Sequence, residues 1–200
     1  TTDYPMIAWC WDMGGSNASN TAGDITSTVR ANPTYGQSIV SWAHDGGSNP
    51  RTIGHGLSSA PEFIIQKLRS ASSDWTVLHK DLSAATKILK LNTNTDEDTA
   101  SDFGNTAPTS SVFSTGITGV TGRTVIAYCF HSVTGYSKFG TYTGSGAAGN
   151  AQTLGFKPAF LMLKKTSATD NWIMMDNTRN PSNPVDKSLR ANTSDAENDL

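Results

Sequence analysis

The chain has 200 residues, which is enough for one or two domains, and only 16% of them are charged. Its net charge of −2 gives no electrostatic reason to bind nucleic acid or an anionic membrane, since both favour a basic surface. No apolar run approaches the roughly 20 residues that a membrane-spanning helix needs. We therefore expect neither a nucleic-acid partner nor a membrane partner.

Strand-like segments follow one another along the whole chain. They are short, rich in β-branched and aromatic residues, and bounded by Gly, Asn, Asp, Ser and Pro, which is typical of strands joined by turns. The segments are 6–11, 37–43, 61–67, 74–79, 86–91, 111–115, 124–130, 137–143, 158–165 and 171–176. No window has a convincing helical stripe, although 81–88 could hold one helical turn. The pattern predicts an all-β protein made of tandem, small antiparallel β-sandwich units of jelly-roll or lectin-like type.

The chain also repeats itself at a domain-sized spacing. The segment PEFIIQKLRSASSDW at 61–75 matches PAFLMLKKTSATDNW at 158–172 without a gap. Three further pairs correspond: 38–46 with 138–146, 89–93 with 189–193, and 6–11 with 125–130. Most of these pairs lie about 100 residues apart, whereas the repeats of solenoid proteins are about 20–50 residues long. The repeat therefore indicates an array of small domains.

The repeat divides the chain into three parts. Residues 1–36 are predicted to be the end of a preceding unit plus a linker, 37–136 a β-sandwich unit, and 137–200 the start of a second unit. The second unit has no counterpart of 111–130, so we expect the chain to be part of a longer protein. We expect a continuation of the chain or a neighbouring subunit to complete this unit. The alternative is that strand 6–11 returns onto it.

Several apolar side chains are expected in the core. Cys10 and Cys129 each lie in a short apolar run, and two cysteines do not make a disulfide framework. We expect both to be buried free thiols. An exposed reactive thiol and a bridge between the two cysteines are the alternatives. Trp42 and its counterpart Tyr142 are expected to be buried as well.

The repeated phrase predicts a hairpin in which Lys and Trp flank a polar turn. Asp74 with Trp75, and Asn171 with Trp172, then lie at matching hairpin ends. Aromatic faces stack on sugar rings, while Asn and Asp side chains hydrogen-bond to sugar hydroxyl groups. These four residues are candidates for a glycan-binding site. The competing interpretation is that a Trp repeated in both copies packs in the core.

An acidic stretch at 92–102 offers the oxygen ligands that Ca²⁺ prefers. The candidate ligands are Asp96, Asp98 and Asp102. An EF-hand loop requires Gly at its sixth position and Glu at its twelfth, but these positions hold Glu97 and Phe103. We therefore favour a solvated acidic loop, and we expect no metal and no cofactor.

Catalytic motifs are not found in the sequence. The four histidines belong to no metalloprotease, serine-hydrolase or Cys–His signature. His79 lies in a predicted strand, and His55 lies between glycines in a predicted turn. We therefore predict that the protein is not an enzyme. A depolymerase, which would need paired carboxylates in a cleft, is the weakest of the alternatives.

Longer phrases carry a resemblance to a known family. They are GYSKFGTYTGSG (135–146), GFKPAFLMLKKTSATDNW (155–172), NPVDKSLRAN (183–192), NTAPTSSVFS (105–114) and SIVSWAHDGGSNPRTIGHGLSSAPEFIIQK (38–67). Together they resemble the repeat domain of tail-fibre-like and other virion structural proteins of tailed phages, especially marine phages and cyanophages. The resemblance covers most of the chain, from about residue 6 to the end.

The resemblance implies a virion location, a lectin-like β-sandwich and a larger parent protein. From it we expect a non-enzymatic structural protein of a tail fibre or other appendage. Its partners would be other virion subunits, including further copies of itself. The alternative function is host attachment, in which the chain is an adhesin that binds a glycan of the host surface.

Overall fold

The structure, a computed structural model, describes residues 6–200. These residues contain strands and loops but no helix, and hence no helix that could cross a membrane. The strands are β1 (Ala18–Asn20), β2 (Ser27–Asn32), β3 (Gln37–Ala43), β4 (Arg51–Gly54), β5 (Phe63–Leu68), β6 (Trp75–His79), β7 (Lys87–Lys90), β8 (Asp98–Thr99), β9 (Val112–Thr115), β10 (Thr124–Phe130), β11 (Phe160–Leu163), β12 (Ile173–Asp176), β13 (Lys187–Ser188) and β14 (Asn198–Asp199).

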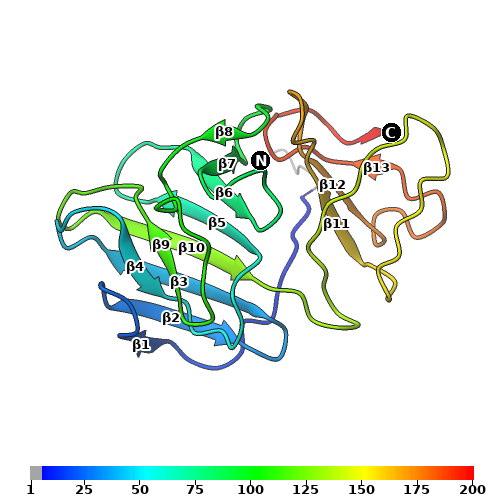
Figure 1. Cartoon of the computed structure of the whole chain (residues 1–200). Helices are drawn as coiled ribbons and strands as arrows, with labels where there is room; N and C mark the ends of the chain where they lie inside the picture. The colour runs from blue at the N-terminus through cyan, green and yellow to red at the C-terminus, as the bar shows by residue number, and fades with distance from the viewer. Residues whose placement is uncertain (1–5) are drawn as a thin grey trace, which may run out of the picture.

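One large antiparallel sheet dominates the molecule. Its eight strands lie in the order β1-β2-β3-β10-β5-β6-β7-β8. The β4–β9 pair lies across one face of this sheet and forms a second layer (Figure 1). The remaining strands form two small sheets, β11–β12 and β13–β14, beside the large one. The predicted all-β, antiparallel and sandwich-like architecture is confirmed.

The alternation of side chains along the strands explains the two layers. In β10, Val125, Ala127 and Cys129 are fully buried, while the residues between them are only partly buried. Alternate residues of a strand point to opposite faces, so these three face the β4–β9 layer. Ile53 of β4 and Phe113 of β9 close the same core from the other side.

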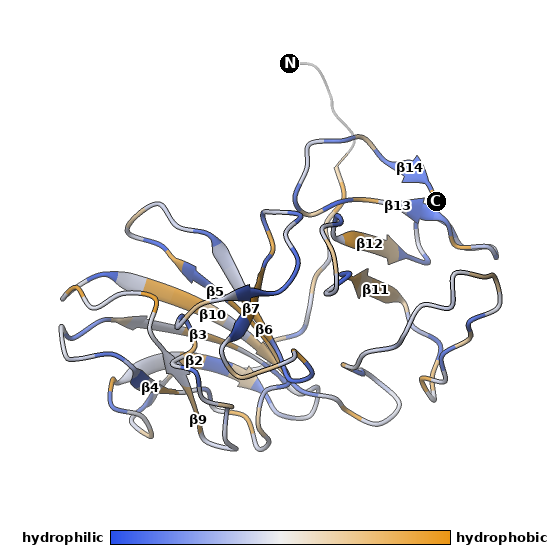
Figure 2. Cartoon of the chain, turned by 45° about the horizontal axis from the view of Figure 1, so that its top comes forward, coloured by the Kyte–Doolittle hydropathy of each residue, from blue (hydrophilic) through white to orange (hydrophobic). Residues whose placement is uncertain are grey.

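The second unit repeats the strand pairing of the first. Phe63 pairs with His79 in the β5–β6 hairpin, and Phe160 pairs with Asp176 in the β11–β12 hairpin. Both members of the second pair lie 97 positions after those of the first. Phe63 and Phe160 therefore occupy equivalent faces of equivalent hairpins, as the gapless match predicts. Figure 2 shows the β11–β12 hairpin as predominantly hydrophobic.

The following two strands repeat as well. Lys87 pairs with Thr99 in β7–β8, and Lys187 pairs with Asp199 in β13–β14. Here both positions differ by 100. The four strands β5 to β8 thus have counterparts in β11 to β14.

Three sequence predictions differ from the structure. The boundary at residue 37 separates strands that the structure joins, since β1 and β2 pair into the same sheet as β3. Segment 6–11 forms no strand, and neither does 137–143. The counterpart of 137–143 in the first unit is paired with β2 and β10, and these strands have no equivalents among the described residues of the second unit. Without a neighbouring strand, the segment forms no strand ladder, and its backbone bonds locally instead: Ser137 pairs with Val133, and the Phe139 N–H donates to Ser132 Oγ.

Two residues expected in the core lie elsewhere. Cys129 is buried, but Cys10 is exposed, and the two thiols are free. Trp42 is buried as predicted, whereas Tyr142 is 52% exposed. Both errors have the same cause, because Cys10 and Tyr142 lie in the two segments that form no strand and so have no sheet face to bury them.

Candidate binding surface

The β5–β6 hairpin places the first pair of predicted glycan-binding residues at its turn. Trp75 lies directly opposite Lys67, so Lys and Trp flank the turn as predicted. Lys67 Nζ lies 5.8 Å from the centroid of the Trp75 ring and donates a hydrogen bond to the backbone carbonyl of Ser73. Asp74 accepts a hydrogen bond from Asn92 Nδ2 at 2.9 Å. Trp75 is partly buried, so part of the residue remains accessible.

An asparagine holds the start of the return strand in both units. Asn92 Oδ1 accepts a hydrogen bond from the Trp75 backbone N–H at 2.8 Å, and Asn192 Oδ1 accepts one from the Trp172 backbone N–H at 2.9 Å. Asn192 Nδ2 also donates to Asn171 Oδ1 at 2.7 Å, the counterpart of the contact made by Asn92 in the first unit. The repeated phrase therefore encodes a repeated local geometry.

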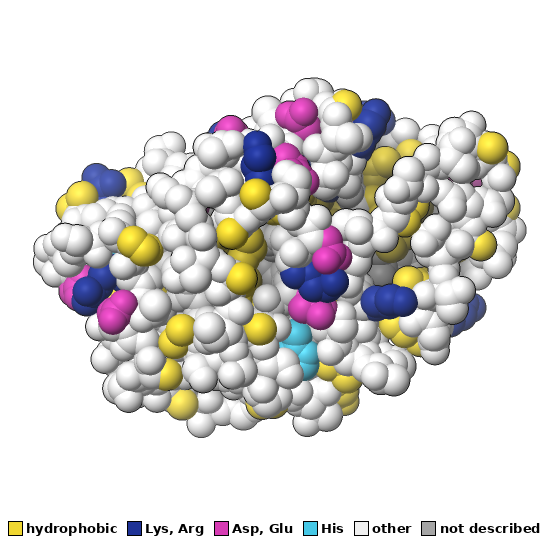
Figure 3. All heavy atoms as spheres, viewed as in Figure 1, with side chains coloured by type: hydrophobic (Ala, Val, Ile, Leu, Met, Phe, Trp, Pro, Cys, Tyr) yellow, Lys and Arg dark blue, Asp and Glu magenta, His cyan; other side chains and the backbone are white. Residues whose placement is uncertain are grey.

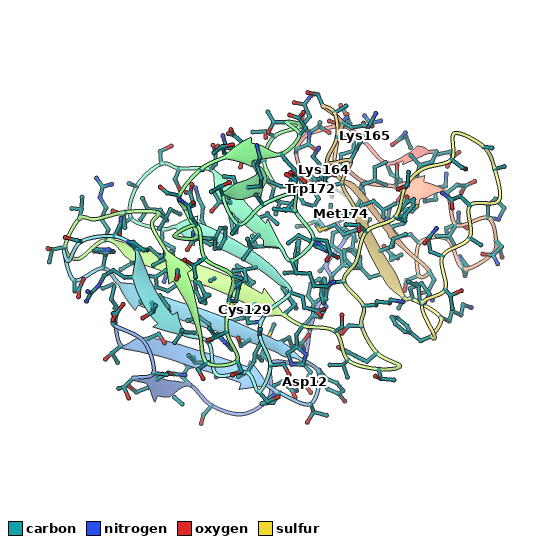
Figure 4. All side chains as sticks on the ribbon, in the orientation of Figure 1. Asp12, Cys129, Lys164, Lys165, Trp172 and Met174 are labelled. Atoms are coloured by element: carbon teal, nitrogen blue, oxygen red, sulfur yellow. The ribbon has the colours of Figure 1, made fainter. Side chains whose placement is uncertain are left out.

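Trp172 lies between the two units and not at an open surface (Figure 4). Its side chain is only 2% exposed and packs against Val77 and Leu89 of the first unit. Its Nε1 donates a hydrogen bond to the backbone carbonyl of Lys90 at 2.9 Å. A ring buried in this way offers no face to a sugar. The prediction that Trp172 binds glycan is therefore corrected, because this residue joins the two units.

The acidic loop of the first unit receives the hairpin turn of the second. The backbone N–H of Asp170 donates to the carbonyl of Asn94 at 2.8 Å, and the backbone N–H of Glu97 donates to the carbonyl of Thr166 at 3.3 Å. Burial lowers the pKa of Lys164 at the same junction, while the nearby carboxylate of Asp170 opposes that shift. The loop thus uses its backbone groups to hold the second unit.

The predicted calcium ligands lie in different environments. Asp98 forms an ion pair with Lys90 at 2.9 Å, and this hydrogen bond lowers the pKa of its carboxyl group. Burial raises the pKa of Asp102. Across residues 6–200, no three His, Cys, Asp or Glu side chains come together as a metal site. The structure therefore does not bring Asp96, Asp98 and Asp102 together.

The segment 6–11 returns to the second unit. The rings of Trp9 and Trp11 pack against Phe160 with centroid distances of 5.4 and 5.7 Å. Trp9 Nε1 donates to Asp176 Oδ2 at 3.1 Å. Burial would raise the pKa of Asp176, but hydrogen bonds from Arg179 outweigh it and hold the value at about 2. The 6–11 segment thus packs on the second unit, but it crosses the hairpin without pairing and does not supply a strand to it.

A shallow groove lies on the face of the large sheet that is turned away from β4–β9. It consists of two adjoining hollows of about 300 and 220 Å³. Thr28 of β2, Ser41 of β3 and Arg69 after β5 line both hollows, and Arg30 and Ile126 line the first. The groove is open and mainly polar, with an aliphatic floor.

A family model for a domain of unknown function, DUF7483, matches the chain over residues 1–200. The chain belongs to the DUF7483 family. Neither the curated proteins nor the solved structures include a significant match to this DUF7483 domain.

The histidines of this DUF7483 domain have structural partners. His44 is buried, contacts Asn49 Oδ1 through Nε2 at 3.0 Å, and accepts a hydrogen bond from the Gly46 backbone N–H at 2.9 Å. His55 is buried and accepts a hydrogen bond from the Leu57 backbone N–H at 3.1 Å. Burial lowers the pKa of His55, which favours the neutral form of the ring. These contacts fix loops next to the core.

The groove residues were missed in the sequence analysis. Arg30 lies on β2, a strand that its polar sequence STVRAN did not reveal. Arg69 directly follows β5 and lies in the polar turn that the repeated phrase predicts. A strand prediction for 27–32 would have exposed the signal, because Thr28 and Arg30 alternate with the buried Ser27 and Val29.

Proposed function

We propose that this DUF7483 chain is a non-enzymatic structural protein of a phage virion, in a tail fibre or other appendage, where its tandem β-units pack against one another. The burial of Trp172 between the two units is the observation that carries the proposal. The phrase-level resemblance to virion structural proteins supports the proposed location. Other virion subunits and further copies of the chain are its proposed partners.

The interface suits a structural role because the second unit depends on it. Its sheets have two strands each, and an isolated two-stranded hairpin is marginally stable at best in water. Trp172 packs onto the first unit with Met162 against the same cluster, and Trp9 packs on Phe160 from the other end of the hairpin. A repeat that gains its stability from its neighbour is well suited to an elongated assembly.

The adhesin alternative loses one half of its predicted site, the hairpin end that carries Trp172. Trp75 is partly accessible, whereas Trp172 is buried, so the two hairpin ends do not form one sugar-binding surface. Of the two predicted hairpin ends, only the one that carries Trp75 is left for glycan binding.

The test is the location of the protein in the particle. Antibodies raised against residues 1–200 are applied to purified virions of the encoding phage, followed by gold labelling and electron microscopy. We expect labelling of an appendage and recovery of the chain's peptides from purified particles by mass spectrometry. A chain found only in the soluble fraction of infected cells, with unlabelled particles, would contradict the proposal.

A further inference from the structure

One row of side chains crosses the outer face of the large sheet from β2 to β6. The strand registers place these residues side by side: Thr28, Ser41, Ile126, Lys67 and Trp75. Neighbouring strands lie about 4.8 Å apart, so four spacings give the row a length of about 19 Å. This length accommodates a short run of sugar rings, and it connects the groove with the accessible part of Trp75.

The row lies beside the second unit and is left open by it. Phe63, Ile65 and Val77 share this face and pack in the cluster that contains Trp172. Thr28 and Arg30, at the other end of the sheet, are exposed. The groove is therefore a surface that the docking of the two units does not use.

The groove concentrates positive charge. Arg30 and Arg69 line it, and Lys67 lies between them and Trp75 along the sheet. None of these three forms an ion pair with a carboxylate within residues 6–200. Neither hollow has a carboxylate among its described lining residues. The opposite side of the molecule differs, because basic and acidic side chains lie next to each other there (Figure 3).

Unpaired arginines at an open groove favour an anionic ligand. The guanidinium group binds carboxylate and sulfate groups through two parallel hydrogen bonds. Arg30 is already oriented, because its Nε donates to Asn17 Oδ1 at 3.1 Å and leaves its terminal nitrogens available. In a chain with net charge −2, the charge of this groove is a local feature.

The other groups in the row match a sugar. Thr28 and Ser41 offer hydroxyl groups, and the partly exposed Ile126 offers an aliphatic surface to the C–H face of a sugar ring. Trp75 ends the row with an aromatic ring. A single-stranded nucleic acid is a poorer fit, because proteins that bind it provide several aromatic platforms for successive bases.

We propose that this groove binds an anionic polysaccharide, with carboxylate or sulfate groups at Arg30 and Arg69 and a sugar ring at Trp75. The proposal is independent of the virion location, since it concerns a surface of the isolated chain. Carboxylated and sulfated sugars share the chemistry that the groove recognises, and the experiment separates them.

The experiment is isothermal titration of the full chain with four probes: oligogalacturonate, dextran sulfate, neutral dextran and a single-stranded oligodeoxynucleotide. The test variant is Arg30→Gln/Arg69→Gln. The control variant is Lys157→Gln/Arg190→Gln, which removes the same charge from the second unit. Circular dichroism confirms that both variants fold.

We expect oligogalacturonate, dextran sulfate or both to bind. Affinity should fall at least about tenfold in the test variant and change less than about twofold in the control, since each arginine contributes charge-assisted hydrogen bonds. Trp75→Leu should also weaken binding. The proposal is overturned if neither anionic sugar binds, if dextran binds equally well, if both double variants lose affinity alike, or if the oligodeoxynucleotide binds more tightly than both sugars.

Discussion

Replacing Trp172 by alanine tests whether the second unit depends on its docking to the first. The substitution removes a side chain that is 2% exposed and the hydrogen bond from its Nε1 to the Lys90 carbonyl. Truncating a buried Trp or Phe to Ala costs about 3–5 kcal/mol, and a typical hydrogen bond contributes about 1 kcal/mol. An interface relaxes more readily than a closed core, so we expect a loss of about 3 kcal/mol, at the lower end of that range.

Two assays measure this loss. Urea unfolding followed by circular dichroism gives the change in stability, and limited proteolysis reports which part of the chain opens. We expect Trp172→Ala to be cleaved faster within 137–200 while the eight-stranded sheet stays protected. Trp172→Phe keeps most of the packing and should cost about 1 kcal/mol, mainly the hydrogen bond.

The equivalent residue of the first unit supplies the control. Trp75 occupies the same position in the same phrase but is half-buried, so Trp75→Ala should cost less than Trp172→Ala and should not open 137–200. If the two alanine variants lose equal stability, or if the proteolysis of 137–200 is unchanged in Trp172→Ala, the docking argument is refuted.

Three further predictions concern single side chains. Cys10 is exposed, whereas Cys129 is buried and has a raised pKa. A thiol reagent should therefore react with about one thiol in the native protein and with two in denaturant. Two thiols that react rapidly in the native protein would contradict this prediction. Burial lowers the pKa of His55, so the contribution of the neutral ring to stability is full above pH 6.5, the ordinary pKa. Below pH 6.5 this contribution declines, because the unfolded chain takes up a proton that the folded chain does not. The urea midpoint of His55→Gln should therefore fall less between pH 8 and pH 5.5 than that of the wild type. The pKa of Asp176 is lowered from 3.8 to about 2. The ionised carboxylate therefore contributes fully to the free energy of unfolding above pH 4, and this contribution is lost as the pH falls towards 2. Asp176→Asn should be less stable than the wild type at pH 5, with a smaller difference at pH 2.5.

Strong alternation made part of the fold predictable. The ranges 37–43 and 124–130 were predicted with the observed bounds, and burial alternates through all of 124–130 and from Ser38 to Trp42. The gapless repeat also predicted that Phe63 and Phe160 occupy equivalent positions. In these cases the local pattern and the tertiary structure agree.

Segments whose partners lie far away in the chain were not predictable in this way. The apolar alternation of 6–11 is typical of a strand, but a strand also needs a neighbour for its backbone groups, and this segment packs its rings across the β11–β12 hairpin instead. The environments of Trp75 and Trp172 differ although their phrases match. Which of the two becomes buried is decided by the contact between the units, which local sequence does not encode.

The groove was hidden for a related reason. Arg30 and Arg69 are 39 positions apart, and only the order of strands in the sheet brings them to one surface. A sequence without evident pairing partners gives no indication of that order. The same limit applies to any binding site built across the middle of an antiparallel sheet.

A cryo-electron microscopy reconstruction of the virion appendage tests the central proposal most directly. The account predicts density for paired β-units in which the turn at 164–172 lies against the loop at 90–97, with Trp172 enclosed between them. It is contradicted by an appendage that contains no such density, or by units whose 164–172 turns are separated from the neighbouring loop and open to solvent.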